Sequence, residues 1–490
     1  MKIALSIPSI YLLALLVLAF LLYVGSSYVL SYAQESNNNN NFDEFRQREF
    51  TEEGTAAVSD SNLEVEEVAA GLELPTTMAF LGSDDILVLE KEKGTVQRII
   101  DGQIQPEPLL DINVAGAVER CMCGIAISTD TPGHTYVFLY YTEAESADRD
   151  DMTDGKAPLG NRLYRYELVN DKLVDPKLLL DLPANPGPRH NGGAIKIGPD
   201  NNLYVTIGDV DDPETQSQNQ RDGGLPDMTS GILRITQEGN PVSGDNSILG
   251  DEPPLNMYYA YGIRNSYGID FDPVTGNLWD TENGPGYGDE INLVEPGFNS
   301  GWTKVQGIWL RGGVDTEAPP SESEAAPLNP ENLVDFDGKG VYRAPEFTWW
   351  HTVGPTAVQF LHSDKLGAQY QNDMFVGDVH NGYLYHFKLN EDRTQLLLTG
   401  EIEDKLADTD EELTEDTGVD GEGIVFGQGF GGITDLEVGP DGYLYVVSIG
   451  QGKIFKIVPG DYSVDTQTNL NNEDGETMQD NNNNNNNDDN

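Results

Sequence analysis

The stretch IKIGPDNNLYVTIGD, residues Ile195–Asp209, contains the pattern that decides the fold. An alternating apolar run leads into a Gly/Pro/Asp/Asn turn, and a second apolar run follows the turn. Apolar residues at every second position on both sides of such a turn are typical of two antiparallel β-strands. A small-residue turn at Gly231 then precedes a third strand pattern, GILRI.

This two-part phrase occurs six times in the chain. The copies begin near Met78, Ile125, Ile195, Ile269, Ala357 and Ile433. A unit of this kind cannot bury both of its faces alone, so the copies must pack face to face. Six sheets arranged radially form a β-propeller, which leaves only short, protected edges. We therefore predict an all-β fold, a six-bladed β-propeller. Its inter-strand loops must be long, because the copies are spaced by roughly 50 to 90 residues and a blade usually needs about 40 to 50.

The flanks of the repeats suggest four parts. Residues 63–459 hold the predicted propeller, and residues 34–62 form a polar linker. Residues 1–33 contain a long apolar run that indicates a signal peptide or an uncleaved membrane anchor, so we expect an exported, extracellular or cell-surface protein. Residues 460–490 are rich in Asn and Asp and are expected to be disordered.

The charge balance excludes one class of partner. The chain has 28 Lys and Arg against 83 Asp and Glu, a net charge of -55. Such a chain repels a phosphate backbone, so we expect no nucleic-acid partner. Most of these carboxylates are expected to be solvated, while some are available to bind Ca²⁺.

The two cysteines, Cys121 and Cys123, are separated by Met122. Three interpretations remain open from the sequence. The pair could be small buried side chains or free thiols, or a soft-metal site for Cu(I) that includes Met122. It could also form an unusual disulfide that closes a strained ring in an oxidising compartment.

A candidate general base lies at one end of the quoted hairpin. His190 precedes Asn191-Gly192-Gly193, where the backbone can approach another group closely, and Asp209 ends the return strand. The two side chains are therefore expected to be neighbours. A carboxylate that orients a histidine fixes its tautomer and raises its basicity. The alternative is that His190 only hydrogen-bonds a loop backbone.

A second segment offers groups for binding a cofactor and a metal. Arg264 and Asn265 lie between a strand and a turn, where they could bind a carboxylate-bearing ligand. The sequence Asn283–Gly286 must turn sharply and expose carbonyls, and Asp289 and Glu290 follow. Oxygen ligands of this kind suit Ca²⁺, although the two acids could be surface charge. Trp349–His351 could line a pocket or cap the core.

In their order and spacing, these motifs resemble the soluble glucose/sorbosone dehydrogenase family, the PQQ (pyrroloquinoline quinone)-dependent aldose sugar dehydrogenases. The resemblance covers most of residues 64–458. Its motifs are G-L-x-x-P at Gly71–Pro75, H-x-G-G at His190, P-D-x-x-L-Y-V-x-x-G-D ending at Asp209, G-x-R-N at Gly262–Asn265, E-x-G-P-x-x-x-D-E-I-N at Glu282–Asn292 and G-x-N-x-G-W at Gly297–Trp302.

The resemblance implies a six-bladed propeller with PQQ and Ca²⁺ at the mouth of its central channel. It implies that His190 takes the proton of the sugar C1 hydroxyl, that Asp209 orients His190, and that hydride passes to the quinone. Arg264 would stabilise the reduced quinone oxygen. Further implied ligands are Asn265 and Asn283 for the cofactor, the carbonyls of Gly284 and Pro285 with nearby Asp289 for its Ca²⁺, and Glu290 for a second, structural Ca²⁺.

Several positions depart from the family pattern. A Gly-Leu-Leu-Gly stretch near a cofactor-contacting glutamine is replaced by Glu119–Gly124, and a usual lysine strand reads Val376–His380. The sixth-blade arginine pair is absent from Gly432–Asp435. PQQ is a tricarboxylate, so three cationic partners are lost. Arg189, which stands where an acid is common, is predicted to compensate together with Arg120 and His380.

We expect an exported PQQ- and Ca²⁺-dependent oxidoreductase that oxidises the C1 hydroxyl of aldoses or related alcohols. An external carrier would accept the electrons, because no dinucleotide-binding fingerprint is present. Two alternatives remain. One is a non-catalytic cell-surface propeller that binds a glycan or protein, favoured if Arg189 and Arg120 do not converge on His190. The other is a hydrolase or lactonase that uses His190 and a Ca²⁺-activated water.

Overall fold

The computed structural model describes residues 54–145, 158–242, 247–311, 330, 332–409, 413 and 423–460. The predicted leader, almost all of the linker and the tail beyond residue 460 lie outside these residues. Strands and loops dominate the described chain, whose 3₁₀-helices include η1 (Gln216–Gln218), η2 (Leu255–Met257), η4 (Ala368–Tyr370) and η5 (Gly400–Asp404). Across the described ranges, no helix is both long and apolar enough to span a bilayer.

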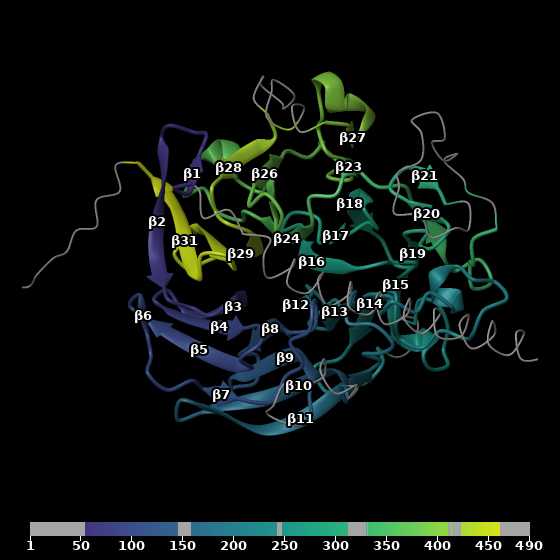
Figure 1. The fold of residues 1–490 in the computed structure, drawn as a ribbon, viewed down its shortest axis with the longest axis horizontal. Coiled ribbons are helices and arrows are strands. Elements are labelled where there is room, and N and C mark those ends of the chain that lie inside the picture. The colour runs from purple at the N-terminus through teal and green to yellow at the C-terminus, as the bar shows by residue number, and fades with distance from the viewer. Residues whose placement is uncertain are drawn as a thin grey trace, which may run out of the picture.

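Six sheets of at least four strands surround a common centre (Figure 1). The first contains β3 (Pro75–Gly82), β4 (Asp85–Glu90), β5 (Thr95–Ile100), β6 (Gln103–Ile104) and β7 (Leu110–Asp111). The second contains β8 (Met122–Ser128), β9 (Tyr136–Glu143), β10 (Gly160–Val169) and β11 (Lys172–Leu182). The third contains β12 (Ile195–Ile197), β13 (Leu203–Ile207), β14 (Gly231–Ile235), β15 (Tyr258–Tyr261), β19 (Phe298–Asn299) and β22 (Val341–Tyr342).

The remaining sheets follow in chain order. The fourth contains β16 (Ser266–Phe271), β17 (Leu278–Glu282), β18 (Tyr287–Val294), β23 (Phe347–His351) and β27 (Leu406–Ala407). The fifth contains β24 (Pro355–Phe360), β25 (Met374–Asp378), β26 (Leu384–Phe387), β28 (Val425–Gln428) and β1 (Ala57–Val58). The sixth contains β29 (Ile433–Val438), β30 (Leu444–Ser448), β31 (Lys453–Pro459) and β2 (Leu63–Ala70). A separate hairpin pairs β20 (Val305–Gln306) with β21 (Trp309–Leu310).

The inner strands of these sheets form a closed ring. Strands β3, β8, β12, β16, β24 and β29 each begin a sheet, and each contacts the inner strand of the next sheet, with β29 contacting β3. The fold is therefore an all-β propeller, as the repeats predict. The count of regular blades is five rather than the predicted six, although the strand pairing yields six sheets.

The last sheet is completed by a strand from the other end of the domain. Strand β2 pairs antiparallel with β31, from Leu63 opposite Pro459 to Ala70 opposite Lys453. The purple and yellow strands lie side by side in Figure 1. This pairing ties the two ends of the ring together and leaves β2 as the outer strand of the sixth sheet.

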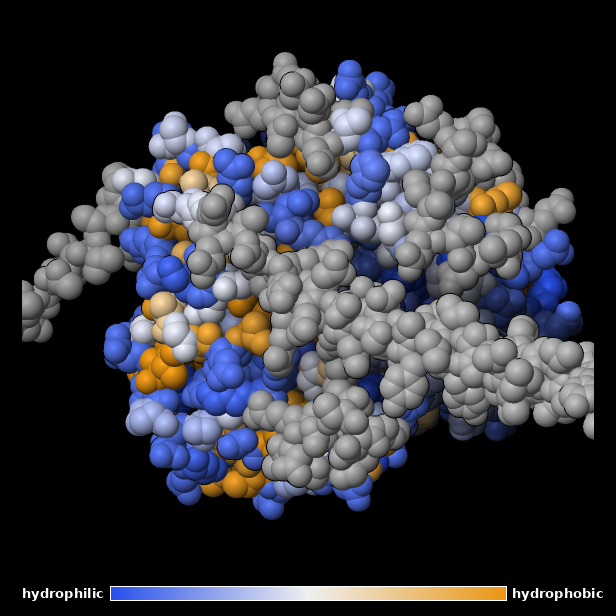
Figure 2. Space-filling model, viewed as in Figure 1, coloured by the Kyte–Doolittle hydropathy of each residue, from blue (hydrophilic) through white to orange (hydrophobic). Residues whose placement is uncertain are grey.

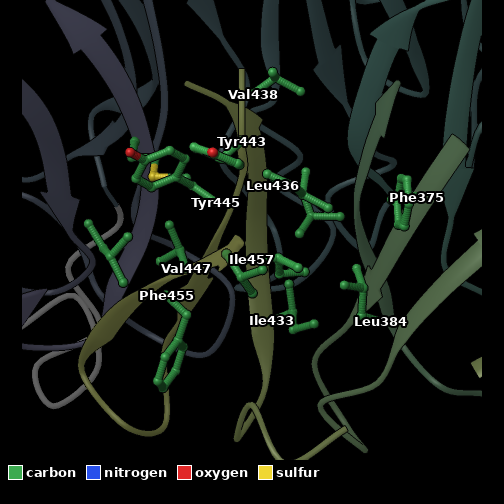
Figure 3. Packing of buried hydrophobic residues seen from close by; sticks show 14 of the residues in the cluster. Phe375, Leu384, Ile433, Leu436, Val438, Tyr443, Tyr445, Val447, Phe455 and Ile457 are labelled. Carbon is green, nitrogen blue, oxygen red and sulfur yellow. The ribbon is translucent and has the colours of Figure 1, made fainter. Parts of the chain in front are cut away.

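The core lies between neighbouring sheets. In Figure 3, Ile433, Leu436 and Ile457 of the sixth sheet lie near Phe375 and Leu384 of the fifth. These side chains belong to one buried apolar cluster. Along β29, Leu436 and Val438 are buried and alternate with the half-buried Asp435 and Glu437, as the period of two requires, while a register shift separates Ile433 from Asp435. In contrast, hydrophilic residues predominate among the coloured residues of the face shown in Figure 2, with separate apolar patches between them.

A buried acid in the fifth sheet gives a stability prediction. Burial raises the pKa of Asp378 to about 7, although bonds from Tyr385, Asn381 and Gly382 oppose that rise. Because the folded-state pKa exceeds the unfolded value, Asp378 stabilises the fold at low pH, and this contribution is lost as pH rises through about 7. The substitution Asp378→Asn should therefore make the unfolding free energy less pH-dependent between about pH 4 and pH 7, measured by denaturant titration. A variant whose slope matches the wild type would contradict this.

Candidate active site

A cavity of about 380 Å³ lies at the centre of the ring, lined by residues from all six inner strands. This volume falls within the range of roughly 300 to 1,000 Å³ that is usual for small-molecule sites. Nine of the site residues predicted from the sequence line it: Arg189, His190, Arg264, Asn265, Asn283, Gly284, Pro285, Asp289 and His380. Of the other two, Asp209 lies behind His190, whereas Glu290 belongs to a separate buried cluster.

His190 and Asp209 form a buried pair. The His190 Nδ1 lies 2.5 Å from the Asp209 Oδ1, and Asp211 Oδ1 is 3.6 Å from the same nitrogen. Burial alone would raise the pKa of Asp209, but the bond and charge of His190 and the charge of Arg264 outweigh it and lower that pKa. We therefore assign the proton between the pair to Nδ1. When the ring is neutral, the His190 Nε2 is then left as an acceptor, which is the state of a general base.

Trp302 supports the far side of this pair. Its Nε1 donates to the Asp209 Oδ2 at 2.8 Å, and only 4% of the residue is exposed. The guanidinium carbons of Arg264 and Arg311 lie 5.4 and 4.2 Å from the indole ring centre. Trp302 thus links the carboxylate of the pair to the cavity arginine. It ends the G-x-N-x-G-W motif, but the sequence does not reveal these contacts.

The substitution Trp302→Phe should lower kcat for the chemistry at His190 by about tenfold or more. A hydrogen bond to a charged group is worth roughly 1.5 to 3 kcal/mol, and about 1.4 kcal/mol is a factor of ten. The lost bond should also raise the pKa of Asp209 and alter the pH–rate profile. Trp309→Phe is the matched control, because Trp309 is equally buried but packs against Tyr287 and Trp350. Equal losses in both variants would show that Trp302 only fills space.

Two buried polar atoms at the cavity have no partner within the described chain. These are Arg264 Nε, a donor, and Asn265 Oδ1, an acceptor. The rest of Arg264 is fixed, since its Nη1 donates to the Asn283 carbonyl at 2.9 Å and its backbone N donates to Glu282 at 2.6 Å. Unsatisfied buried groups are costly, so a bound ligand with hydrogen-bonding atoms would satisfy both.

Asp289 shapes the turn that holds Gly284 and Pro285. Its Oδ1 accepts from the Gly284 N at 2.7 Å, and its Oδ2 accepts from the Val353 and Gly354 N atoms at 2.7 and 2.8 Å. Burial raises the pKa of Asp289 to about 6. A Cβ at Gly284 would lie 2.0 Å from the Tyr287 carbonyl oxygen, so only glycine fits there. The structure thus assigns Asp289 a supporting role, and metal ligation by it stays a prediction.

Glu290 joins two other acids away from the cavity. In the register of β17 and β18, Glu282 faces Glu290 and Asp280 faces Asn292. All four residues are at most 1% exposed, and both carboxylate oxygens of Asp280 lack a partner in the described part of the chain. Burial and mutual repulsion raise the pKa of Asp280 and of Glu290 well above their usual values. The unpartnered oxygens of Asp280 are candidates to bind a cation such as Ca²⁺. The oxygens of Glu282 and Glu290 already accept hydrogen bonds, among them those from Ser300 and Gln306.

The cavity lining is balanced in charge. Its acids are Glu119, Asp289, Asp435 and Glu437, and its lysines and arginines are Lys91, Arg189, Lys196 and Arg264. Deep in the ring, the Lys196 Nζ lies 2.7 Å from Glu437 and 3.9 Å from Asp270. Burial alone would lower the pKa of Lys196, but these acids outweigh it and raise that pKa. Sequence reasoning missed this cluster, because its members come from three different sheets.

The predicted compensating cations have separate positions. Arg120 is buried, and its Nη2 donates to the carbonyls of Ala184 and Gly187 at 2.7 and 3.2 Å, so it supports a loop instead of facing His190. This placement corrects the expectation for Arg120. Arg189 is exposed at the cavity. His380 is also exposed there, with its Nδ1 3.2 Å from the Thr352 carbonyl oxygen.

Two open interpretations are resolved. Cys121 and Cys123 form a disulfide, which excludes both the free-thiol and the Cu(I) interpretations in this structure. In the Trp349–His351 stretch, Trp349 is buried against Phe347 and Tyr385 and caps the core. None of the three residues lines the cavity.

Comparisons with known proteins agree with this geometry. Residues 72–456 match the profile of the glucose/sorbosone dehydrogenase family. An aldose sugar dehydrogenase of Escherichia coli is 23% identical over 407 residues, which cover 82% of this chain and 94% of that protein. The solved PQQ-bound aldose sugar dehydrogenase of Streptomyces coelicolor has a TM-score of 0.56 and 22% identity, covering 81% of this chain and 98% of that chain.

A relative of another kind is also similar. The human Hedgehog-interacting protein is 25% identical over 309 residues, which cover 57% of this chain and 40% of that protein. Similarity in this fold therefore extends beyond proteins named as dehydrogenases.

Proposed function

Because the chain belongs to the glucose/sorbosone dehydrogenase family, we propose that it is a PQQ- and Ca²⁺-dependent oxidoreductase that oxidises the C1 hydroxyl of aldoses or related alcohols. The observation that carries this proposal is the His190–Asp209 pair beside the cavity, next to the unsatisfied Arg264 Nε and Asn265 Oδ1. A base, a cation and an amide at one small-molecule cavity suit alcohol oxidation.

The chain's own residues supply proton transfer and orientation. His190 Nε2 accepts the proton of the substrate hydroxyl, while Asp209 holds Nδ1–H and stabilises the imidazolium that forms. Trp302 keeps the Asp209 carboxylate in place. The Arg264 guanidinium offers its free Nε–H to an oxygen that gains negative charge. When bound, the quinone would supply the hydride acceptor, and an external carrier would then take the electrons.

The donor set fits a quinone cofactor in part. Arg264, Asn265 and Asn283 would hold its polar edge, and the carbonyls of Gly284 and Pro285 would hold a Ca²⁺ ion. A solved sugar dehydrogenase of this fold is PQQ-bound. The tricarboxylate would also need cations, and the exposed Arg189 and His380 at the cavity are the candidates. We further propose that all six sheets act as blades, that residues 1–33 direct export, with a possible membrane tether, and that Glu290 with Asp280 holds a second Ca²⁺.

A calorimetric titration of PQQ into the purified protein, with and without Ca²⁺, tests this proposal. Dye reduction with a panel of aldoses should follow. We expect Ca²⁺-dependent binding of PQQ and reduction of the dye by at least one sugar. Absence of binding at every Ca²⁺ concentration would refute the cofactor assignment.

The balanced lining favours one alternative, a propeller that binds a ligand without oxidising it. Four acids against four lysines and arginines give no net attraction for a tricarboxylate, and a relative of this fold is named as an interacting protein. The same titration separates the two functions, because a binding propeller should bind glycans or proteins while ignoring PQQ.

A further inference from the structure

We propose that the Cys121–Cys123 disulfide is a positioning element of the candidate active site, and that its reduction to two thiols lowers turnover while the propeller stays folded. The turnover part rests on the proposed dehydrogenase function. The inference concerns how the chain holds its own residues at the cavity, so it can also be tested in the absence of any cofactor.

The disulfide lies at the cavity and touches the segment that follows His190. Both cysteines line the cavity, with Cys121 almost fully buried and Cys123 partly exposed. A Cβ at Gly193 would lie 2.5 Å from the Cys123 Cβ, and one at Gly124 would lie 1.9 Å from the Gly193 carbonyl oxygen. The backbone from 123 to 124 therefore packs directly against the glycine three residues after His190.

Glu119, two positions before Cys121, connects three parts of the site. The Glu119 Oε2 accepts bonds from the His190 backbone N at 2.5 Å, from Tyr267 OH at 3.0 Å and from the Asn265 Nδ2 at 3.1 Å. Glu119 follows Val118, whose φ of 52° is rare for a β-branched residue. Such strain persists only where the surroundings enforce it, and it is often found at functional sites.

Arg120, between Glu119 and Cys121, contacts the loop that precedes His190. Arg120 donates to the carbonyls of Ala184 and Gly187, as described above, and the Glu119 N donates to the Pro188 carbonyl at 3.2 Å. Residues 118–124 therefore contact the chain both before and after His190. A shift of this segment must be transmitted to the base.

The effect of this disulfide is expected to be local. In the chain-entropy account, stabilisation of the whole fold grows with the length of the closed loop, and this loop has only one residue between the cysteines. Its main effect is to restrict the backbone between Glu119 and Gly124. Reduction by an external dithiol breaks the S–S bond and forms two S–H groups. The dithiol supplies two electrons and two protons and becomes a disulfide itself.

The sequence makes the experiment clean, because the chain has only two cysteines and every titratable thiol reports this pair. The protein is reduced with a dithiol, the reagent is removed under anaerobic conditions, and only then is PQQ with Ca²⁺ added. We expect at least a tenfold fall in kcat, because misplacement of a reacting group by about 1 Å can cost about a hundredfold. Reoxidation should restore kcat. The double variant Cys121→Ser/Cys123→Ser should resemble the reduced protein and be insensitive to the dithiol.

Two further readouts separate positioning from folding and from the proposed function. The melting temperature should change little on reduction, and the Cε1–H NMR signal of His190, assigned with His190→Asn, should shift in cofactor-free protein. Equal kcat in both states, or global unfolding on reduction, would overturn the inference. If the oxidised protein has no activity with any sugar, the proposed function fails, and the NMR signal decides alone: an unchanged signal refutes the positioning role.

Discussion

Replacing His190 by asparagine is expected to lower kcat for sugar oxidation by about 10² to 10⁴-fold, the usual contribution of a positioned general base. Asparagine is close in size and can still hydrogen-bond Asp209, but it cannot take a proton near neutral pH. Substrate binding depends on other groups, so KM should change far less than kcat. Steady-state dye reduction with the PQQ-loaded variant measures both constants.

His134→Asn is the matched control for this experiment. The His134 Nδ1 lies 2.7 Å from Glu167, so it forms a similar histidine–carboxylate pair, but its side chain is 45% exposed and it does not line the cavity. This control should retain wild-type activity. If His190→Asn keeps more than about a tenth of wild-type kcat, His190 is not the base, and the binding interpretation gains weight.

Binding of Ca²⁺ is expected to stabilise the fold strongly. Asp280, Glu282 and Glu290 are three buried acids on the neighbouring strands β17 and β18, and ionisation of all three without a cation would be costly. A ligand that binds only the native state adds RT ln(1 + [L]/Kd), about 2.7 kcal/mol when its concentration is 100 times Kd. Denaturant titration in chelator and in excess Ca²⁺ should show a gain of this order.

The difference in unfolding free energy between the variant Asp280→Asn and the wild type should change sign between chelator and excess Ca²⁺. In chelator it should be more stable than the wild type, because an amide avoids the cost of burying this carboxylate or of protonating it. In Ca²⁺ it should gain less, because one charged ligand is lost. Asp84→Asn is the control on an exposed acid. A wild type whose unfolding free energy ignores Ca²⁺ would show that these acids are simply protonated, as their raised pKa values allow.

The fold could be predicted because its signal is local. Alternation within each strand and the turn that follows are set by neighbouring residues, and Ile195–Asp209 contains both. His190 and Asp209 could be paired for the same reason, since they flank one hairpin. Arg264 and Gly284 flank the β16–β17 hairpin of the fourth sheet. That they reach the same cavity as His190, which precedes β12 of the third sheet, depends on the order of sheets around the ring. This order could be inferred once a closed propeller was predicted and the family motifs were recognised.

The missed features depend on contacts between distant parts of the chain. Trp302 meets Asp209 across 93 positions, and Lys196 meets Glu437 across 241. Asp280 was missed for a subtler reason. It lies in the middle of β17, and only the register of β17 against β18 places it beside Asn292 among buried acids. Pairing of the two cysteines was left open, because spacing alone does not decide whether they bond.

The closure of the ring by β2 and β31 has a consequence for how the domain can be handled. The Gly460 N donates to the Asn62 carbonyl at 2.7 Å, so the two ends of the ring are hydrogen-bond neighbours on the outermost strands of one sheet. A peptide could join them, and new ends could then be opened elsewhere, for example in the exposed turn at residues 131–133 between β8 and β9. Such a circular permutant would keep every cavity residue, and a linker that starts before β1 would also keep β1 in the fifth sheet. A reporter fused after Gly460 leaves the protein on the outer part of the sixth sheet, away from the inner strands that line the cavity.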